Sequence, residues 1–385
     1  MGPSPAATSA TGAVPAPPPS DAAPRPLAAD ELARARAELH AHYRARFGRL
    51  ELRALAADAS IDLDELAEPL DAMHVEASGA PAPTWHPISM AAGTSHFDVV
   101  GGDRPGVVRM LAQPAPLLTL LERPHARPCV VIGTAGSGKS LFLHRCAIAG
   151  SGGDRFLGID RAIPVHVALA VARAAPQRSL ADHAIASLRA AGLAIADAID
   201  AEATAGRVVF LLDGLDEVGP AVQAVARAIT ALAATYPAAR IVVTSRPAGL
   251  AGIDLAADHL QLEGLDDDAI GRLLARWCEL DERRLAPDDP AAGERGKADG
   301  LRLAARVFAT PHLHDLAACP LLATYLAVLH RAGAPLPDRR IELYDRIGQL
   351  VVARWNQVRP RAERGTPPIG SADVIRLLGP VAFAI

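Results

Sequence analysis

A four-residue apolar run that leads directly into a glycine-rich loop constrains this chain more than any other segment. The run CVVI at residues 129–132 is followed by GTAGSGKS at residues 133–140, which fits the pattern G-x-x-x-x-G-K-[ST]. Glycines at these positions let the backbone turn tightly, so that successive N–H groups point at phosphate oxygens. Lys139 would reach the β- and γ-phosphates of a nucleotide, and the Ser140 hydroxyl would bind Mg²⁺. The order of strand, loop and helix therefore predicts an α/β fold with a nucleotide site at this loop.

The predicted nucleotide contacts extend over the whole loop and into the helix that follows it. This helix would point the positive end of its dipole at the same phosphates. The alternative is a glycine-rich turn without a ligand, but such a turn has no use for a lysine at position 139. The residues expected to contact the nucleotide here are Gly133, Thr134, Ala135, Gly136, Ser137, Gly138, Lys139, Ser140 and Leu141.

A second apolar run ends in a cluster of acids at residues 208–217, VVFLLDGLDE. Consecutive apolar residues of this kind are typical of a strand buried on both faces of a parallel sheet. Asp213 at the end of that strand lies where open α/β sheets bind ligands, and its carboxylate suits Mg²⁺. Asp216 and Glu217 follow closely enough to orient or deprotonate an attacking water, so both are predicted to be catalytic. The alternative is a turn followed by solvated acids.

A third buried-strand pattern, RIVVTSRP at residues 240–247, ends in hydroxyl residues and an arginine. A guanidinium at the end of such a strand could sense or stabilise charge on the γ-phosphate. Arg246 is therefore the third predicted catalytic residue. For this residue alone, a surface arginine in a loop is the competing interpretation.

Together the three segments resemble the NACHT family of signal-transduction NTPases, part of the wider STAND group. The most specific part of the resemblance is the run DGLDE at residues 213–217, which accompanies the loop at 133–140 and TSRP at 244–247. Residues 319–322 resemble the proline-bearing motif on the adenine side of the family's site. This resemblance implies that Pro320 also contacts the nucleotide.

The resemblance spans residues 123–356 and implies ATP or ADP with Mg²⁺ as ligands. It further implies a slowly hydrolysing ATPase used as a switch, which self-associates in the ATP state and acts on an unknown effector after an unknown trigger. Bacterial relatives act in antiphage defence. The alternative is an ordinary P-loop ATPase or kinase of unknown substrate. The chain has no N-K-x-D or L-S-G-G-Q motif, and only Arg155 and Arg161 could serve a kinase lid.

Composition and pattern divide the chain into five parts. Residues 1–29 form a Pro- and Ala-rich tail that is expected to be disordered, and residues 30–106 form a helical lead-in and linker. Residues 107–256 are expected to form the NTPase domain, with a parallel sheet between two helical layers, and residues 257–360 a small helical bundle. By resemblance, residues 361–385 begin a winged-helix region, so the chain is expected to be a truncated piece.

Individual elements are expected at the following places. The lead-in begins with an amphipathic helix whose N-cap is Asp30. Its apolar face is formed by Leu32, Leu39, Tyr43 and Phe47. Strands of the NTPase domain begin at Cys129, Ile163, Val208 and Ile241, and a helix begins at Pro220. Beyond residue 266 only helical patterns occur, at 270–278, 301–308, 321–331 and 341–355.

Charge, apolar content and cysteine spacing exclude several other classes. The net charge is −4 without a basic block, and aromatic residues make up 4%, so there is no nucleic-acid signal. The longest apolar stretch, residues 321–329, is too short to span a bilayer. The four cysteines are far apart, and no cysteine or histidine spacing predicts zinc. They are expected to be buried thiols, and the chain is expected to be cytoplasmic.

Overall fold

The structure is a computed structural model that describes most of the chain between residues 26 and 349. The described residues are 26–51, 60–66, 68–77, 99–101, 104–106, 108–110, 114–173, 175, 178–337, 339, 341–343, 345–346 and 348–349. The expected disordered tail up to residue 25 lies outside them. The expected winged-helix segment and the end of the predicted helix at 341–355 also lie outside.

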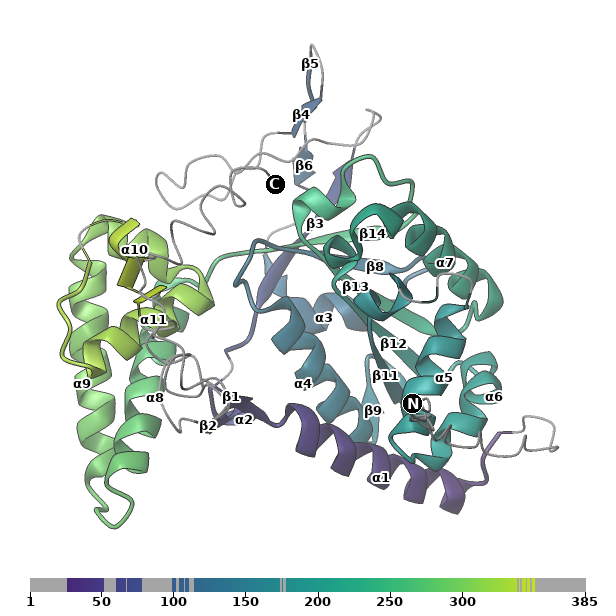
Figure 1. The fold of residues 1–385 in the computed structure, drawn as a ribbon, viewed down its shortest axis with the longest axis horizontal. Helices are drawn as coiled ribbons and strands as arrows, with labels where there is room; N and C mark the ends of the chain where they lie inside the picture. The colour runs from purple at the N-terminus through teal and green to yellow at the C-terminus, as the bar shows by residue number, and fades with distance from the viewer. Residues whose placement is uncertain are drawn as a thin grey trace, which may run out of the picture.

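An eight-stranded sheet forms the centre of the fold (Figure 1). Its five parallel strands, in spatial order, are β11 (Ile163–Ala168), β12 (Val208–Asp213), β13 (Arg240–Ser245), β8 (Cys129–Ile132) and β14 (Asp258–Leu262). The first four begin at, or within one residue of, the positions that the sequence predicts. Because β13 lies between β8 and β12, the strand that carries Asp213 is not a direct neighbour of the strand that leads into the glycine-rich loop.

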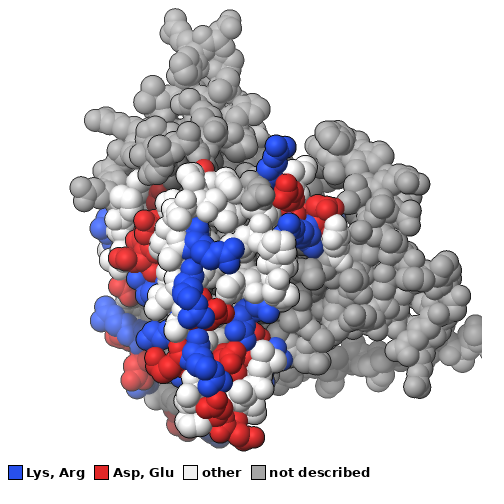
Figure 2. Space-filling model, turned by 90° about the vertical axis from the view of Figure 1, so that its left-hand side faces the viewer, with Lys and Arg blue, Asp and Glu red and all other residues white. Residues whose placement is uncertain are grey.

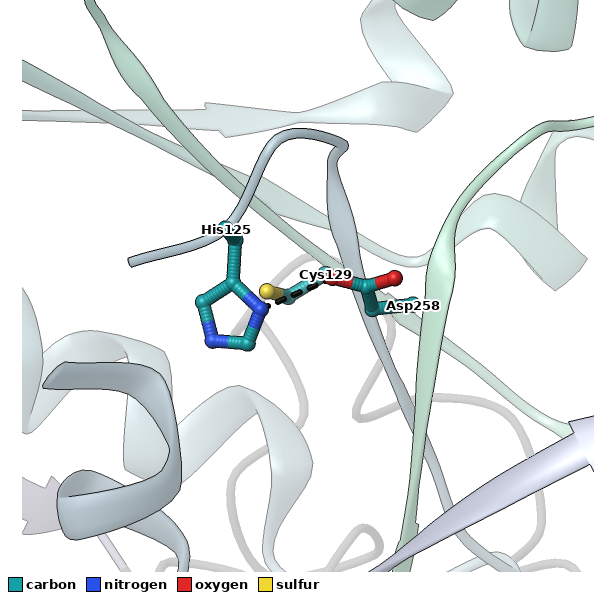
Figure 3. A group of neighbouring side chains, drawn as sticks. All are labelled: His125, Cys129 and Asp258. Atoms are coloured by element: carbon teal, nitrogen blue, oxygen red, sulfur yellow. Dashed lines mark hydrogen bonds and ion pairs between the residues drawn. The ribbon is translucent and has the colours of Figure 1, made fainter. Parts of the chain in front are cut away.

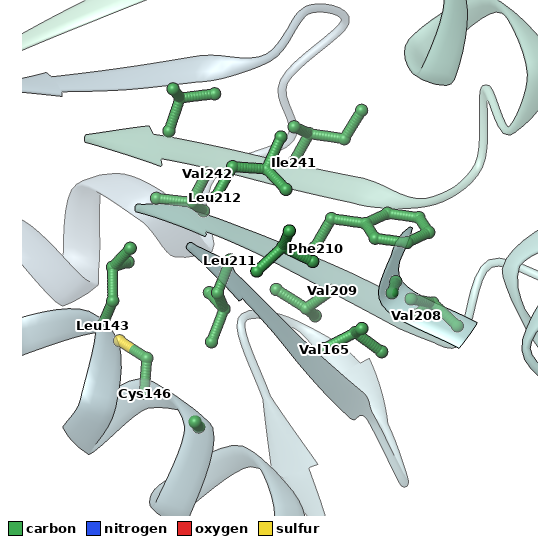
Figure 4. Packing of buried hydrophobic residues seen from close by; sticks show 14 of the residues in the cluster. Leu143, Cys146, Val165, Val208, Val209, Phe210, Leu211, Leu212, Ile241 and Val242 are labelled. Carbon is green, nitrogen blue, oxygen red and sulfur yellow. The ribbon is translucent and has the colours of Figure 1, made fainter. Parts of the chain in front are cut away.

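The parallel strands are apolar because both faces of the sheet are covered. All five residues from Val208 to Leu212 are fully buried, as are all four of β8. Figure 4 shows Leu143 and Cys146 of the helix after the loop packed beneath Leu211, while Phe210 lies among neighbouring strand residues. A strand in this setting reads as a continuous hydrophobic run rather than an alternating one.

Helices cover the sheet on both faces. The chain moves three places along the sheet from β8 to β11 and then back, one strand at a time, to β12 and β13. Right-handed crossovers therefore place α4 (Lys139–Gly152) on one face and the helices of the return path on the other. Those helices are α5 (Leu180–Ala190), α6 (Ile199–Thr204) and α7 (Val222–Thr235). The predicted parallel three-layer α/β fold is confirmed.

Three antiparallel strands extend the sheet beyond β14. The sequence predicted neither these strands nor β14. They are β3 (Asp71–Ala77), β6 (Val108–Met110) and β7 (Ala115–Pro116). The sheet thus includes residues of the expected lead-in, and β14 extends it past the expected domain boundary at residue 256. The reason is local, because β14 reads DHLQL and its polar residues hide the strand pattern.

The remaining elements are short. They are β1 (Arg49–Glu51), β2 (Ser60–Asp62), α2 (Leu63–Leu66), β4 (Val99–Gly101), β5 (Arg104–Gly106), α3 (Leu117–Glu122), β9 (Arg155–Phe156), β10 (Ile159–Asp160) and the 3₁₀ turns at 169–173, 194–198, 215–221 and 247–250. The turn at 215–221 corrects one expectation. Pro220 lies inside it, after a break at Gly219 (φ +64°), and α7 begins only at Val222.

The first helix, α1 (Ala29–Phe47), packs against α4. The Arg36 guanidinium donates to the carbonyls of Ala162 and Gly150 at 3.1 Å, and the Tyr43 hydroxyl donates to that of Pro164 at 3.1 Å. The predicted apolar face is buried. The predicted N-cap is wrong, because the helix is capped at Ala28, whose N–H donates to the Glu31 carboxylate at 2.9 Å.

A second hydrophobic core holds the helical domain. Its helices are α8 (Asp267–Leu285), α9 (Ala292–Phe308), α10 (Pro311–Ala317) and α11 (Pro320–Arg331). Close approach of α8 and α9 requires Gly296 and Gly300, because a Cβ at either would lie 2.4 Å from the carbonyl oxygen of Cys278 or Leu274. The small helical bundle that the sequence predicts is therefore present.

Charged side chains of both signs are interspersed on the outer face of this helical domain (Figure 2). Pairs within one helix include Arg283 with Glu279 at 2.7 Å and Arg302 with Asp299 at 2.9 Å. Exposed pairs of this kind contribute roughly 0–1 kcal/mol each. These two pairs therefore contribute little to the stability of the domain.

One helical run in the described part of the chain, Leu215–Thr235, is long and apolar enough to cross a membrane. It joins the turn at 215–221 to α7, and Gly219 breaks its helical geometry. Val225, Ala226, Ile229 and Leu232 of α7 are buried in the protein. One side of this run therefore belongs to the hydrophobic core around the sheet.

Candidate functional site

The glycine-rich loop joins the end of β8 to the start of α4. Gly136 and Gly138 have φ values of +79° and +93°, which side-chain-bearing residues rarely adopt. The Lys139 ammonium folds back over the loop and donates to the carbonyls of Gly133 and Thr134, both at 2.7 Å. The predicted loop is therefore built as the sequence indicates, with its lysine at the first position of the helix.

The predicted metal ligands lie together at the ends of β12 and the loop. The Ser140 hydroxyl donates to Oδ1 of Asp213 at 3.1 Å. Neighbouring ligands of an octahedral Mg²⁺ ion lie about 3 Å apart, since each Mg–O bond is roughly 2.0–2.1 Å. Two hard oxygen donors at this spacing fit Mg²⁺, and the structure thus brings the two predicted ligands together.

A threonine of the adjacent strand fixes the carboxylate of Asp213. The Thr244 hydroxyl donates to Oδ1 of Asp213 at 2.5 Å and accepts from the N–H of Gly214 at 2.9 Å. Thr244 is almost fully buried, so these bonds are shielded from water. Asp213 is therefore held toward the loop rather than free to rotate into solvent.

The two other acids have different surroundings. Asp216 accepts from the N–H of Arg246 at 3.0 Å and forms an ion pair with its Nε at 3.0 Å, and its side chain is 13% exposed. Glu217 is exposed. Asp216 is therefore held by Arg246, whereas the side chain of Glu217 is open to solvent.

A cavity of about 490 Å³ opens between the loop, the acids and the helical domain. The N–H of Leu321 in α11 donates to the carbonyl of Gly136 at 3.2 Å, so the helical domain rests on the loop. A Cβ at Gly136 would lie 2.8 Å from Cβ of Leu321. The predicted site residues that line the cavity are Ala135, Gly136, Gly138, Lys139, Ser140, Leu141, Asp213, Asp216, Glu217, Arg246 and Pro320.

Three predicted contact residues do not line this cavity. Gly133, Thr134 and Ser137 lie behind the Lys139 side chain, which contacts all three. The rest of the wall includes apolar side chains of a kind that suits a nucleobase. They are Phe47, Leu66, Leu70, Leu265, Leu273 and Leu321.

Comparison with known proteins identifies the domain that carries this site. Residues 127–281 match the family model of the NACHT domain. The chain contains a NACHT domain. Among solved structures, PCH-2 of C. elegans is similar over 56% of this chain and 67% of that chain, at 14% identity and a TM-score of 0.29. Curated proteins gave no match.

The NACHT match covers the phosphate-binding loop, the acids after β12 and Arg246, and it ends inside α8. The coarse function follows from this match and from the geometry of the loop, and it is that of a P-loop NTPase that binds nucleotide. Pro320 lies beyond the matched residues, although the structure places it on the wall of the same cavity.

Burial and charge shift the pKa of Lys139 in opposite directions. Burial lowers the pKa of Lys139, whereas the carboxylate of Asp216 raises it. A partly desolvated ammonium gains more from an approaching anion than a fully hydrated one does. Lys139 is thus suited to hold a phosphate group.

Two histidines, His144 and His166, lie close to Asp213, and no sequence pattern predicts a role for them. The ring of His144 in α4 stacks on Phe47 at 4.0 Å and an interplanar angle of 5°, and His166 of β11 meets the same ring at 5.0 Å. Burial, and then the charge of His144, lowers the pKa of His166 to about 4. Both rings are therefore neutral near pH 7, and they connect the last residue of α1 to the floor of the nucleotide site.

Proposed function

We propose that this chain is an ATP-binding, slowly hydrolysing molecular switch that oligomerises in a signalling pathway. The observation that supports the proposal is the hydrogen bond from Leu321 to Gly136, which attaches α11 directly to the phosphate-binding loop. A phosphate that reorders the loop must change this contact. The nucleotide state is in this way coupled to the position of the helical domain.

In this proposal Lys139 and the loop amides hold the phosphates, and Ser140 and Asp213 hold Mg²⁺, which would neutralise phosphate charge. Glu217 orients or deprotonates the attacking water. Arg246, held by Asp216, stabilises charge on the γ-phosphate. Pro320 and the apolar wall receive the base.

The energy needed for such a switch is modest. Changing a two-state equilibrium from 1:99 to 99:1 takes about 5.5 kcal/mol of differential binding. Hydrogen bonds to charged groups contribute about 1.5–3 kcal/mol each, so a few contacts to a γ-phosphate suffice. The proposal extends to a defence role, which rests on the family resemblance alone, and to a cytoplasmic location, which rests on the sequence pattern.

Light scattering coupled to size exclusion tests the proposal on the full chain. A non-hydrolysable ATP analogue with Mg²⁺ should produce a larger species than ADP does. Leu321→Ala keeps the N–H donor but removes most of the side chain that packs on Gly136, so it should weaken this response while nucleotide still binds. Leu301→Ala is the matched control, because Leu301 is also an exposed leucine of the helical domain but does not line the cavity.

Two results would contradict the proposal. One is the same particle mass with either nucleotide, despite saturated binding. The other is rapid phosphate transfer to a small acceptor, which would indicate the alternative, a kinase. Turnover assays with candidate acceptors, run beside the sizing experiment, separate the two classes.

A further inference from the structure

Three side chains with metal-binding atoms meet at the amino end of β8, away from the nucleotide site. A ring nitrogen of His125, the sulfur of Cys129 and a carboxylate oxygen of Asp258 all lie within 4.8 Å of one another. Figure 3 shows the imidazole of His125 and the carboxylate of Asp258 converging beside the sulfur of Cys129. Nitrogen, sulfur and oxygen in one cluster form a donor set that suits Zn²⁺ and related ions.

The backbone fixes two of these ligands relative to each other. Cys129 and Asp258 are the first residues of adjacent parallel strands and are register partners in the sheet. The N–H of Asp258 also donates to the carbonyl of Pro128 at 2.9 Å. The third ligand, His125, lies four residues before Cys129 in the loop after α3. Ligands held on a sheet need little reorganisation before they bind an ion.

The second ring nitrogen of His125 has the partner that a metal-binding histidine usually has. Its Nε2 lies 3.0 Å from the carbonyl oxygen of Leu120, and such a contact requires a proton on Nε2. The other nitrogen, Nδ1, lies 2.8 Å from Oδ2 of Asp258, and the proton between them must leave before an ion can bind there. A backbone carbonyl on the distal N–H fixes the ring orientation and increases the basicity of the metal-facing nitrogen.

We infer that His125, Cys129 and Asp258 bind one divalent transition-metal ion, with Zn²⁺ as the best fit. The ion would take Nδ1, Sγ and a carboxylate oxygen as three ligands. Water would supply the fourth ligand. It would enter from the side of Asp258, because the side chain of Asp258 is 36% exposed and that of His125 only 7%. A thiolate, a carboxylate and a neutral imidazole around a dipositive ion give a net charge of zero, which reduces the cost of burial.

Without an ion, the thiol of Cys129 is held in its protonated form, mainly by burial. Burial, and then the charge of Asp258, raises the pKa of the Cys129 thiol to about 12. A free thiolate is therefore scarce at this position. A metal ion reverses the situation, because a coordinating thiol is deprotonated outright.

The site lies at the opposite end of β8 from the phosphate-binding loop. The strand spans Cys129 to Ile132, and at about 3.3 Å per residue it separates the two sites by roughly 10 Å along the chain. An ion here would join the loop after α3 to β14, the strand that leads into the helical domain. Its effect would thus be on the stability of the sheet rather than on phosphate binding.

Cobalt substitution tests the inference on the full chain, with any histidine tag removed. One equivalent of Co²⁺ should give a near-ultraviolet sulfur-to-cobalt charge-transfer band and visible bands of tetrahedral intensity, and Zn²⁺ should displace it. Cys129→Ser should abolish the charge-transfer band. Cys278→Ser is the matched control, because Cys278 is also a fully buried thiol with a raised pKa but belongs to the helical domain core.

A second variant covers the case in which Cys129→Ser does not fold. Asp258→Asn keeps the side-chain volume and should weaken Co²⁺ binding at least tenfold while circular dichroism stays unchanged. The inference fails if wild-type protein binds no Co²⁺, or if Co²⁺ binds without a thiolate band. It also fails if the band survives in Cys129→Ser or is lost in Cys278→Ser. None of these measurements contains nucleotide, so their outcome is independent of the proposed switch.

Discussion

The two ends of strand β8 carry polar groups of different kinds. At the carboxyl end, the glycine-rich loop supplies backbone N–H groups and the Lys139 ammonium, which attract an anion. At the amino end, His125, Cys129 and Asp258 supply soft and hard side-chain donors, which attract a cation. A single buried strand thus separates an anion site from a proposed cation site.

The two sites differ in how far apart in the sequence their residues lie. The anion site is built from consecutive residues, so a local sequence determines most of its shape. The cation site needs two residues that are 133 positions apart, His125 and Asp258, and it exists only after β14 has paired with β8. If the two ends are independent, changes at one should leave the other unaffected.

The largest effect is expected at the carboxyl end, from Glu217→Gln. Loss of a general base lowers turnover about 10²- to 10⁴-fold, while nucleotide binding should persist because the loop is unchanged. Steady-state phosphate release and calorimetric titration measure the two quantities. Glu294→Gln, an exposed acid in α9, is the matched control and should turn over as the wild type does. Normal turnover in Glu217→Gln would move the water-activating role to Asp216 or off this strand.

The sequence predicts the carboxyl end well for a physical reason. Gly133 to Ser140 is one contiguous run, and the residues of this run themselves form the backbone that surrounds the phosphate. Thr244 was part of the pattern, yet its bond to Asp213 depends on the pairing of β13 with β12, which the sequence does not state. Nothing in the spacing of the cysteines could reveal the amino-end cluster, since its geometry is a property of the folded sheet.

The side of the sheet formed by β14 and the antiparallel strands was not predicted, for a related reason. Strand β14 reads DHLQL, and its Gln261 is buried although it is polar, so no continuous apolar run marks the strand. Its partner β3 belongs to the expected lead-in, so the contact joins segments far apart in the chain. Burial on both faces makes β8 and β12 recognisable in the sequence, whereas a strand of mixed polar and apolar residues gives only a weak pattern.

The next effect, also at the carboxyl end, is the loss of nucleotide stabilisation in Lys139→Ala. A ligand at a hundredfold its Kd adds about 2.7 kcal/mol to the free energy of unfolding, and this increment should vanish without the ammonium. Thermal melts with and without ATP and Mg²⁺ measure it. The cobalt spectrum of Lys139→Ala should equal that of the wild type. An unchanged nucleotide shift would place the nucleotide elsewhere, and an altered cobalt spectrum would show that the two ends are coupled.

A smaller effect concerns the acid sensitivity of His166, behind Asp213. Its pKa is lowered to about 4 in the folded protein, while the unfolded value is about 6.5. The unfolded chain therefore binds the extra proton first, and stability is retained above pH 6.5 and lost as pH falls toward 4. The loss between pH 7 and pH 5 is about 2 kcal/mol. Burial also lowers the pKa of His144 and His259, so urea unfolding at both pH values should show a smaller loss in His166→Leu than in the wild type, with His312→Leu as the control.

The smallest expected effect tests the independence of the two ends most directly. Cys129→Ser should change the Kd for ATP and Mg²⁺ by less than about threefold, or roughly 0.6 kcal/mol, because β8 keeps its register with β13 and its apolar residues Val130 to Ile132. Calorimetric titration of wild-type and variant protein, both with Zn²⁺ added and both stripped of it, measures this difference. A larger change that appears only when Zn²⁺ is present would mean that the amino end regulates the nucleotide site through β8. A larger change in both conditions would mean that the substitution distorts the strand itself, and the separation of the two sites would then have to be abandoned.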